Sequence, residues 1–161
     1  MKVLRIRDVK LPQRAPGKNA GIDIFIPNSK DFFIKKGDKF IKIENELFLK
    51  PGESALIPSG LKISVPENHV AIVFNKSGIA AKRNLVIGAC VIDESYQGEI
   101  HIDIHNIGNE TQIIKSGEKI TQLLVLPINY TSIEEVNSEE ECFGGIKTER
   151  GEGGFGSTGT E

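Results

Sequence analysis

Cysteine and aromatic residues are scarce in this chain of 161 residues, which has two cysteines, no tryptophan and 6% aromatic residues. Cys90 and Cys142 lie far apart without a C-x-x-C pattern, which argues against a disulfide framework or a zinc knuckle and favours a reducing compartment. No run approaches the roughly 20 apolar residues of a membrane span, and the first residues lack a signal-peptide pattern. We therefore expect a cytoplasmic protein with no membrane partner.

An excess of basic charge is also missing. The 20 lysines and arginines are balanced by 22 acidic residues, which gives a net charge of −2. Binding along a phosphate backbone normally leaves a basic excess, so nucleic acid is not expected as a partner. A small ligand held by a few convergent groups fits this balance better.

Short β-branched segments, often with period-two alternation, run through most of the chain. The segments are residues 3–7, 22–26, 39–43, 61–65, 70–74, 100–104 and 120–126. Proline and glycine separate them at a spacing of roughly 8–12 residues, which is typical of a β-sandwich or barrel. The sequence therefore predicts an all-β fold.

One short helix or single turn is expected at residues 77–83, with Ser77 in the N-cap position and Gly78 weakening the helix. From Ile133 onward the strand pattern gives way to glutamate and glycine, with too few apolar residues to offset the entropy of ordering. We predict a β domain over residues 1–145 and a flexible C-terminal arm over residues 146–161.

The glycine-rich end carries groups that suit an anion. Arg150 is a bidentate donor, Ser157 and Thr158 add hydroxyl donors, and Phe155 offers a stacking face among glycines that leave the backbone accessible. Composition alone also fits a passive tether.

The segment 91–99 places Asp93 directly after small and apolar residues, with Tyr96 three residues later. The carboxylate could be sheltered and aimed at a ligand that Tyr96 covers. The alternative is a hairpin whose polar turn makes only local hydrogen bonds.

Two other polar clusters carry weaker signals. Residues 75–78 combine a cation, a hydroxyl and a flexible backbone that could hold phosphate, although any surface loop can contain Lys-Ser-Gly by chance. His101, Asp103 and His105 alternate on one strand face and could be metal ligands. A solvated or subunit-facing surface is the simpler interpretation, because the intervening isoleucines would then face inward.

Five segments, in this order, resemble the motifs of the trimeric dUTPase family, the deoxyuridine triphosphate nucleotidohydrolases. They are residues 20–24, 76–80, 91–99, 117–123 and 150–159. The resemblance implies a jelly-roll β barrel and a homotrimer with active sites at the subunit interfaces. It also implies Mg²⁺-dependent hydrolysis of dUTP to dUMP and pyrophosphate, which lowers dUTP and supplies dUMP for thymidylate synthesis.

The resemblance also implies a role for each matching residue. Asp93 would activate the water that attacks the α-phosphorus. Tyr96 would lie against the deoxyribose, and the backbone from Cys90 to Ile92 would read the uracil edge. Asp23 would lie in the outer shell of Mg²⁺, through water. The implied phosphate and base contacts are Lys76, which replaces a common arginine, Ser77, Gly78, Gln122, Arg150, Phe155, Gly156, Ser157 and Thr158.

Residues 29–40 are longer than the compact family pattern needs. We expect an added hairpin packed on the barrel, or else a binding surface for a protein partner. Two alternative functions stay open: a dCTP deaminase-like enzyme of the same fold, and a dUTP-gated regulator that binds a protein through this insert.

Overall fold

The computed structural model describes residues 1–28, 32–44 and 46–154, and the chain divides into two compact units. The first unit comprises Met1–Asn129 and contains the strands and one helix; the second comprises Tyr130–Glu161. Within the described residues, neither helix is long and apolar enough to cross a membrane.

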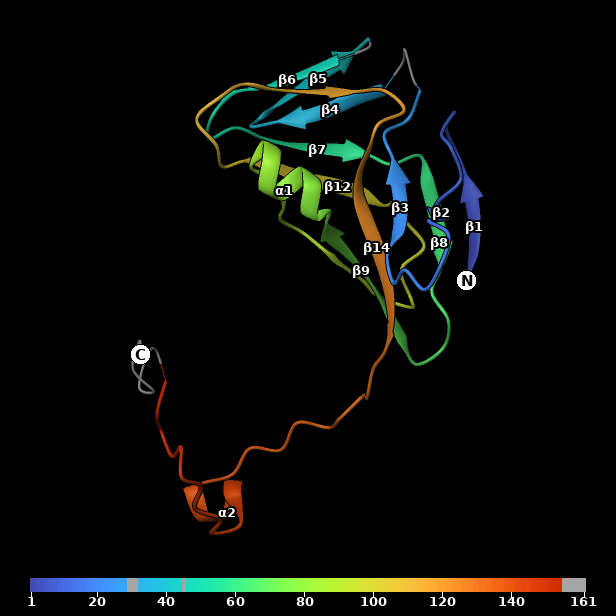
Figure 1. The fold of residues 1–161 in the computed structure, drawn as a ribbon. Coiled ribbons are helices and arrows are strands. Elements are labelled where there is room, and N and C mark those ends of the chain that lie inside the picture. Colours follow the sequence, from blue (N-terminus) through green and yellow to red (C-terminus); the bar gives the residue numbers. More distant parts are fainter. Residues whose placement is uncertain (29–31, 45, 155–161) are drawn as a thin grey trace. The chain divides into compact units, whose positions relative to one another are not determined.

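The strands of the first unit confirm the all-β prediction (Figure 1). They are β1 (Lys2–Arg5), β2 (Gln13–Arg14), β3 (Ile22–Phe25), β4 (Phe32–Lys36), β5 (Lys39–Ile43), β6 (Glu46–Leu49), β7 (Ser54–Pro58), β8 (Leu61–Ser64), β9 (His69–Asn75), β10 (Leu85–Ile87), β11 (Val91–Ile92), β12 (His101–Asn106), β13 (Gln112–Lys115) and β14 (Lys119–Pro127).

Two five-stranded antiparallel sheets form most of this unit. One has the order β10-β12-β7-β4-β5 and the other β11-β9-β14-β3-β2, and the pairs β1-β8 and β13-β6 complete the strand pairing. The β3, β14 and β9 strands therefore lie side by side, although they come from distant parts of the sequence (Figure 1).

Period-two alternation decides which side chains enter the core. On β12, Ile102 and Ile104 are completely buried, whereas His101 is exposed and Asp103 and His105 are partly exposed. Burying each isoleucine contributes about 1.5–3 kcal/mol, which fixes this face inward. The inward prediction for these isoleucines is confirmed.

The predicted short helix is α1 (Ser77–Arg83), which follows β9 directly. Its N-cap is Lys76, in an extended conformation and without a side-chain capping bond, so the expectation of Ser77 as the cap is wrong. Ser77 is instead the first helical residue. Asn84 ends the helix in the left-handed conformation, where asparagine is tolerated.

The described part of the 29–40 segment forms a hairpin with the strand that follows it. The β4 and β5 strands pair in register around Gly37, whose φ of 58° suits a tight turn, and Lys35 of β4 also pairs with Leu56 of β7. Ile34 and Ile43 are buried in the core. The hairpin is therefore an integral part of its sheet.

The second unit contains a helix, α2 (Glu139–Phe143), that sequence analysis did not predict. The Ser138 side chain accepts a hydrogen bond from the Glu141 amide at 3.2 Å, and Gly144 ends the helix with a φ of 61°. This serine-to-glutamate spacing and the terminal glycine are the local signals of a capped helix.

Candidate functional site

A pocket of about 350 Å³ lies where the ends of β3, β9 and β14 meet. We call it the Lys76 pocket; its lining residues are Ala15, Asn19, Ala20, Gly21, Asp23, Lys76, Lys119, Gln122 and Leu124. The structure thus brings together Asp23, Lys76 and Gln122 from the predicted first, second and fourth motifs.

Asp23 is the charged centre of the Lys76 pocket. Its side chain is only 8% exposed, and its two oxygens contact different ammonium groups, Oδ1 that of Lys76 and Oδ2 that of Lys119. Burial by itself raises the pKa of Asp23, but the hydrogen bonds from Lys76 and Lys119 outweigh it and hold the pKa below its ordinary value. The Asp23 carboxylate is therefore charged. Together with the two ammonium groups of Lys76 and Lys119, it forms a cluster with a net charge of +1.

Lys119 had no predicted role, and a β-bulge explains why. Lys119 pairs with Phe25 and Gln122 pairs with Asp23, with a register shift between Lys119 and Thr121. Phe25 and Asp23 are two residues apart on β3, so Lys119 and Gln122 point to the same face. In a regular strand, two residues three positions apart point to opposite faces. The extra residue of the bulge brings Lys119 onto the same face as Gln122.

Gln122 is held close to Gly21, the residue directly before β3. Its Nε2 donates a hydrogen bond of 2.8 Å to the backbone oxygen of Asn75, the last residue of β9. A Cβ at position 21 would lie 1.9 Å from Gln122 Oε1, so this approach requires glycine. The first and fourth motifs are therefore fitted to each other.

The Lys76 pocket is suited to a polyphosphate. Lys76 and Lys119 supply two ammonium groups, Gln122 supplies an amide, and Ser77 and Gly78 are exposed directly after Lys76. Ammonium groups bind phosphate as point charges, and each can leave Asp23 for a ligand oxygen without a large rearrangement.

The pocket fits Mg²⁺ only in the outer-shell manner predicted for Asp23. In the part of the chain that the structure describes, no three His, Cys, Asp or Glu side chains gather as a metal site. Asp23 offers a single carboxylate that already faces two ammonium groups. A hydrated Mg²⁺ held by ligand phosphates needs no more protein ligands than this.

A second pocket, of about 260 Å³, lies at the 91–99 segment. We call it the Tyr96 pocket; its lining residues are Val73, Ala89, Cys90, Val91, Ile92, Tyr96, Glu99, Ile100 and His101. It contains the predicted residues Cys90, Ile92 and Tyr96. Asp93 follows β11 and is exposed in a single copy of the chain, so the expected shelter for its carboxylate is not provided there.

Asp93 and Lys76 lie near opposite ends of β9. Ile92 pairs with Ala71, so Asp93 follows beside Val70, whereas Lys76 comes after the other end of the strand. A strand advances about 3.3 Å per residue, which separates Val70 from Lys76 by roughly 20 Å. One copy of the chain therefore does not bring Asp93 to the Lys76 pocket.

The fifth predicted motif lies in the second unit. Arg150 is exposed, and its Nε donates a hydrogen bond of 2.9 Å to the backbone oxygen of Gly153. The other predicted contacts of this motif, Phe155, Gly156, Ser157 and Thr158, lie outside the described residues.

Comparison with known proteins extends the motif similarity to the whole chain. The dUTPase family model matches residues 40–159. A deoxyuridine 5'-triphosphate nucleotidohydrolase of Anaplasma marginale is 31% identical, with 99% of this chain and 98% of that protein covered. One of Clostridium kluyveri is 39% identical over 80% of this chain and 89% of that protein.

The fold is also shared with solved structures. The Staphylococcus bacteriophage 80alpha dUTPase, a G164S mutant with dUpNHpp, superposes with a TM-score of 0.74 at 26% identity, covering 98% of this chain and 97% of that one. This agreement confirms the predicted jelly-roll class. Motifs, pockets and full-length similarity lead to one conclusion: the chain belongs to the dUTPase family.

Proposed function

We propose that this protein hydrolyses dUTP to dUMP and pyrophosphate, and so lowers dUTP and supplies dUMP for thymidylate synthesis. The observation that carries the proposal is the near-complete coverage of the chain by relatives named for this reaction, with four of the five motifs lining or adjoining two pockets. The family relationship makes dUTP the first substrate to test.

Asp93 is the proposed general base. Its carboxylate takes a proton from a water molecule, whose oxygen forms a bond to the α-phosphorus while the bond from that phosphorus to the bridging oxygen breaks. Pyrophosphate leaves with the bonding electrons. Such proton transfer contributes about 10²–10⁴-fold to a rate. The exposed position of Asp93 leaves it accessible to substrate and water.

The Lys76 pocket is the proposed phosphate site. Lys76, Lys119 and Gln122 line the same cavity, and phosphate oxygens replace Asp23 as the partner of the two ammonium groups when dUTP binds. When bound, Mg²⁺ would neutralise charge on the phosphate oxygens, and Asp23 would contact its waters.

The Tyr96 pocket is the proposed site for sugar and base. Tyr96, Cys90 and Ile92 all line this cavity. In the proposed complex the Tyr96 ring would exclude a 2′-hydroxyl, and the backbone from Cys90 to Ile92 would face the uracil edge. Exclusion by shape is effective because packed protein yields little.

The separation of Asp93 from Lys76 in one copy supports a site completed by a second copy, and the resemblance to the trimeric dUTPases makes a homotrimer the proposed assembly. We infer that the Tyr96 pocket of one copy meets the Lys76 pocket of another, so that each active site is completed at an interface. The arm then contributes Arg150 together with its final glycine-rich residues. Sedimentation equilibrium tests the trimer, and a monomer with full activity would contradict it.

Pyrophosphate release from dUTP, dTTP, UTP and dCTP, each with and without Mg²⁺, tests the function. We expect dUTP to be the preferred substrate and Asp93→Asn to abolish its turnover while nucleotide binding persists. Asp38→Asn, in the exposed turn between β4 and β5, is the matched control. Ammonia release from dCTP would indicate a deaminase instead, and parental turnover by Asp93→Asn would contradict the mechanism.

One observation favours an additional protein partner. On the outer face of the hairpin, Phe33 is 54% exposed and Phe40 is 73% exposed, with Lys35 directly opposite Phe40. Exposed aromatic side chains beside cations are typical of protein interfaces. Because Ile34 is buried, Phe33→Ser with Phe40→Ser is a better test than deletion of residues 29–40. This double variant should keep dUTP turnover and lose partner capture in pull-downs with and without a dUTP analogue.

A further inference from the structure

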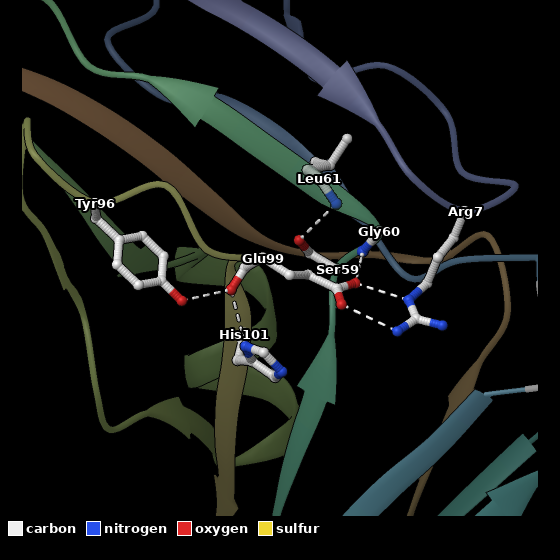
Figure 2. A network of polar contacts seen from close by, with 7 residues as sticks. All are labelled: Arg7, Ser59, Gly60, Leu61, Tyr96, Glu99 and His101. Carbon is white, nitrogen blue, oxygen red and sulfur yellow. Dashed lines mark hydrogen bonds and ion pairs between the residues drawn. The ribbon is translucent and has the colours of Figure 1, made fainter.

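A partly buried ion pair connects the N-terminal segment to the segment that carries Tyr96 (Figure 2). The Arg7 guanidinium donates two hydrogen bonds to the Glu99 carboxylate, from Nε to Oε1 at 2.7 Å and from its terminal nitrogen to Oε2 at 3.0 Å. The Gly60 amide donates a third, to Oε1, at 2.8 Å. The Glu99 side chain is 12% exposed, so this charge depends on these donors.

The backbone of Glu99 holds the other part of the network. Its carbonyl oxygen accepts a hydrogen bond of 2.9 Å from the Tyr96 hydroxyl, and Nδ1 of His101 lies 2.9 Å from the same oxygen (Figure 2). The tyrosine ring and the ion pair are thus attached to opposite ends of one residue. A displacement of the Glu99 carboxylate changes the position of the acceptor that holds Tyr96.

Two glycines allow these approaches. Gly60 has a φ of 76°, and a Cβ there would lie 3.0 Å from Cβ of Arg7. A Cβ at Gly98 would lie 2.2 Å from the Tyr96 hydroxyl oxygen. Glycine is therefore required at both ends of the network, at Gly60 beside Arg7 and at Gly98 beside the Tyr96 hydroxyl, because a Cβ would occupy the space that these side chains need.

We propose that Arg7 and Glu99 are positioning residues that set the Tyr96 ring against the sugar and thereby set the preference for deoxyribonucleotides. The inference rests on the proposed function. It assigns roles to Arg7 and Glu99, to which the family resemblance assigned none. Tyr96 is 44% exposed on a turn, so its rotamer is not fixed by burial. The hydroxyl bond to Glu99 holds the far end of the ring, and Arg7 holds Glu99.

Loss of Arg7 leaves the Glu99 carboxylate largely buried with a single backbone donor. An unpaired charge in such a place moves toward water or takes a proton, and we expect the side-chain movement to shift the Glu99 backbone that holds Tyr96. The Tyr96 ring then loses its fixed position and leaves room for a 2′-hydroxyl. Since displacement of a binding group by about 1 Å can cost up to 10²-fold, a tenfold change in selectivity is a reasonable expectation.

The test compares Arg7→Met, Arg7→Lys and the wild-type protein. Dissociation constants for non-hydrolysable dUTP and UTP analogues are measured by calorimetry, and kcat and KM are measured for both nucleotides. We expect Arg7→Met to lower the dUTP-to-UTP selectivity about tenfold, mainly through KM, and Arg7→Lys to restore part of it. Lys36→Met is the control, since it breaks a 2.6 Å ion pair between Lys36 of β4 and Glu53, away from Tyr96.

The outcomes separate this inference from the proposed function. Wild-type protein that binds and selects dUTP without hydrolysing it contradicts the proposed function alone. Unchanged selectivity in Arg7→Met, even with a lower Tm, overturns the positioning role. If Arg7→Met does not fold, Tyr96→Phe decides, because it removes only the bond to Glu99: lower selectivity supports the inference and unchanged selectivity overturns it.

Discussion

The ammonium nitrogen of Lys119 lies 3.1 Å from Oδ2 of Asp23, while Lys76 contacts the other oxygen of the same carboxylate. Lys119 is half exposed, whereas Asp23 is almost fully buried. The buried anion therefore keeps two ammonium groups at the pocket in the free protein. This arrangement would reduce the reorganisation that the proposed phosphate binding requires.

Lys119→Met tests the contribution of this second cation. We expect the KM for dUTP to rise about tenfold with a smaller change in kcat, because a charge-assisted contact to phosphate is lost while the Asp93 region is unaltered. Lys115→Met, on β13 and 64% exposed in its ion pair with Glu46, should leave the KM unchanged. Equal KM values for Lys119→Met and wild type would show that Lys119 does not bind substrate.

Gly21→Ala tests the fit between the first and fourth motifs. The added Cβ collides with Gln122 Oε1 and forces this side chain out of its bond to Asn75. We expect a higher KM for dUTP with little loss of global stability, because Gln122 is only partly buried. Gln122→Ala should have a similar effect. Combining the two substitutions should add little, and fully additive effects in this double-mutant cycle would contradict the coupling.

Glu99 should give the folded state a specific pH dependence. Burial raises its pKa, but the bonds from Arg7 and the Gly60 amide outweigh burial and hold the pKa below the ordinary 4.5. A depressed folded-state pKa gives stability that is present above the unfolded value and lost as the pH falls through the folded value. Glu99→Gln should therefore cost about 1–3 kcal/mol above pH ~5 and progressively less below it.

Urea unfolding of wild type, Glu99→Gln and the exposed Glu44→Gln at several pH values measures this effect. Glu44→Gln should follow the wild-type curve. A constant difference between Glu99→Gln and wild type down to pH ~3 would refute the linkage.

Ser138→Ala should destabilise α2 by about 1 kcal/mol, because the Glu141 amide loses its capping acceptor. Cα chemical shifts of residues 139–143 should move toward coil values, whereas unfolding of the β unit should be unchanged. Ser132→Ala, outside the helix, is the control. Unchanged shifts at α2 would show that the cap is dispensable.

Regular features of the fold could be predicted because local chemistry determines them. Alternation placed Ile102 and Ile104 inward, and proline and glycine marked the ends of the strands. The family resemblance singled out Asp23, Lys76 and Gln122, which the structure places around one pocket, whereas it did not single out Lys119 of the same pocket.

Other parts of the site depend on contacts that no local pattern contains. Arg7 and Glu99 are 92 residues apart, and neither shows a periodicity that indicates the other. The distance of Asp93 from Lys76 follows from strand register, which a list of motifs does not include. The α2 helix was missed because its apolar content is low, although its serine and glycine caps were visible.

The bulge in β14 also limits how the enzyme can be redesigned. Inserting one residue between Lys119 and Gln122 would reverse the alternation, and the lysine ammonium would then turn toward the buried face that carries Thr121 and Leu123. Loops grafted from related enzymes must therefore preserve the residue count of this short stretch, because its length, as much as its composition, selects which side chains line the Lys76 pocket.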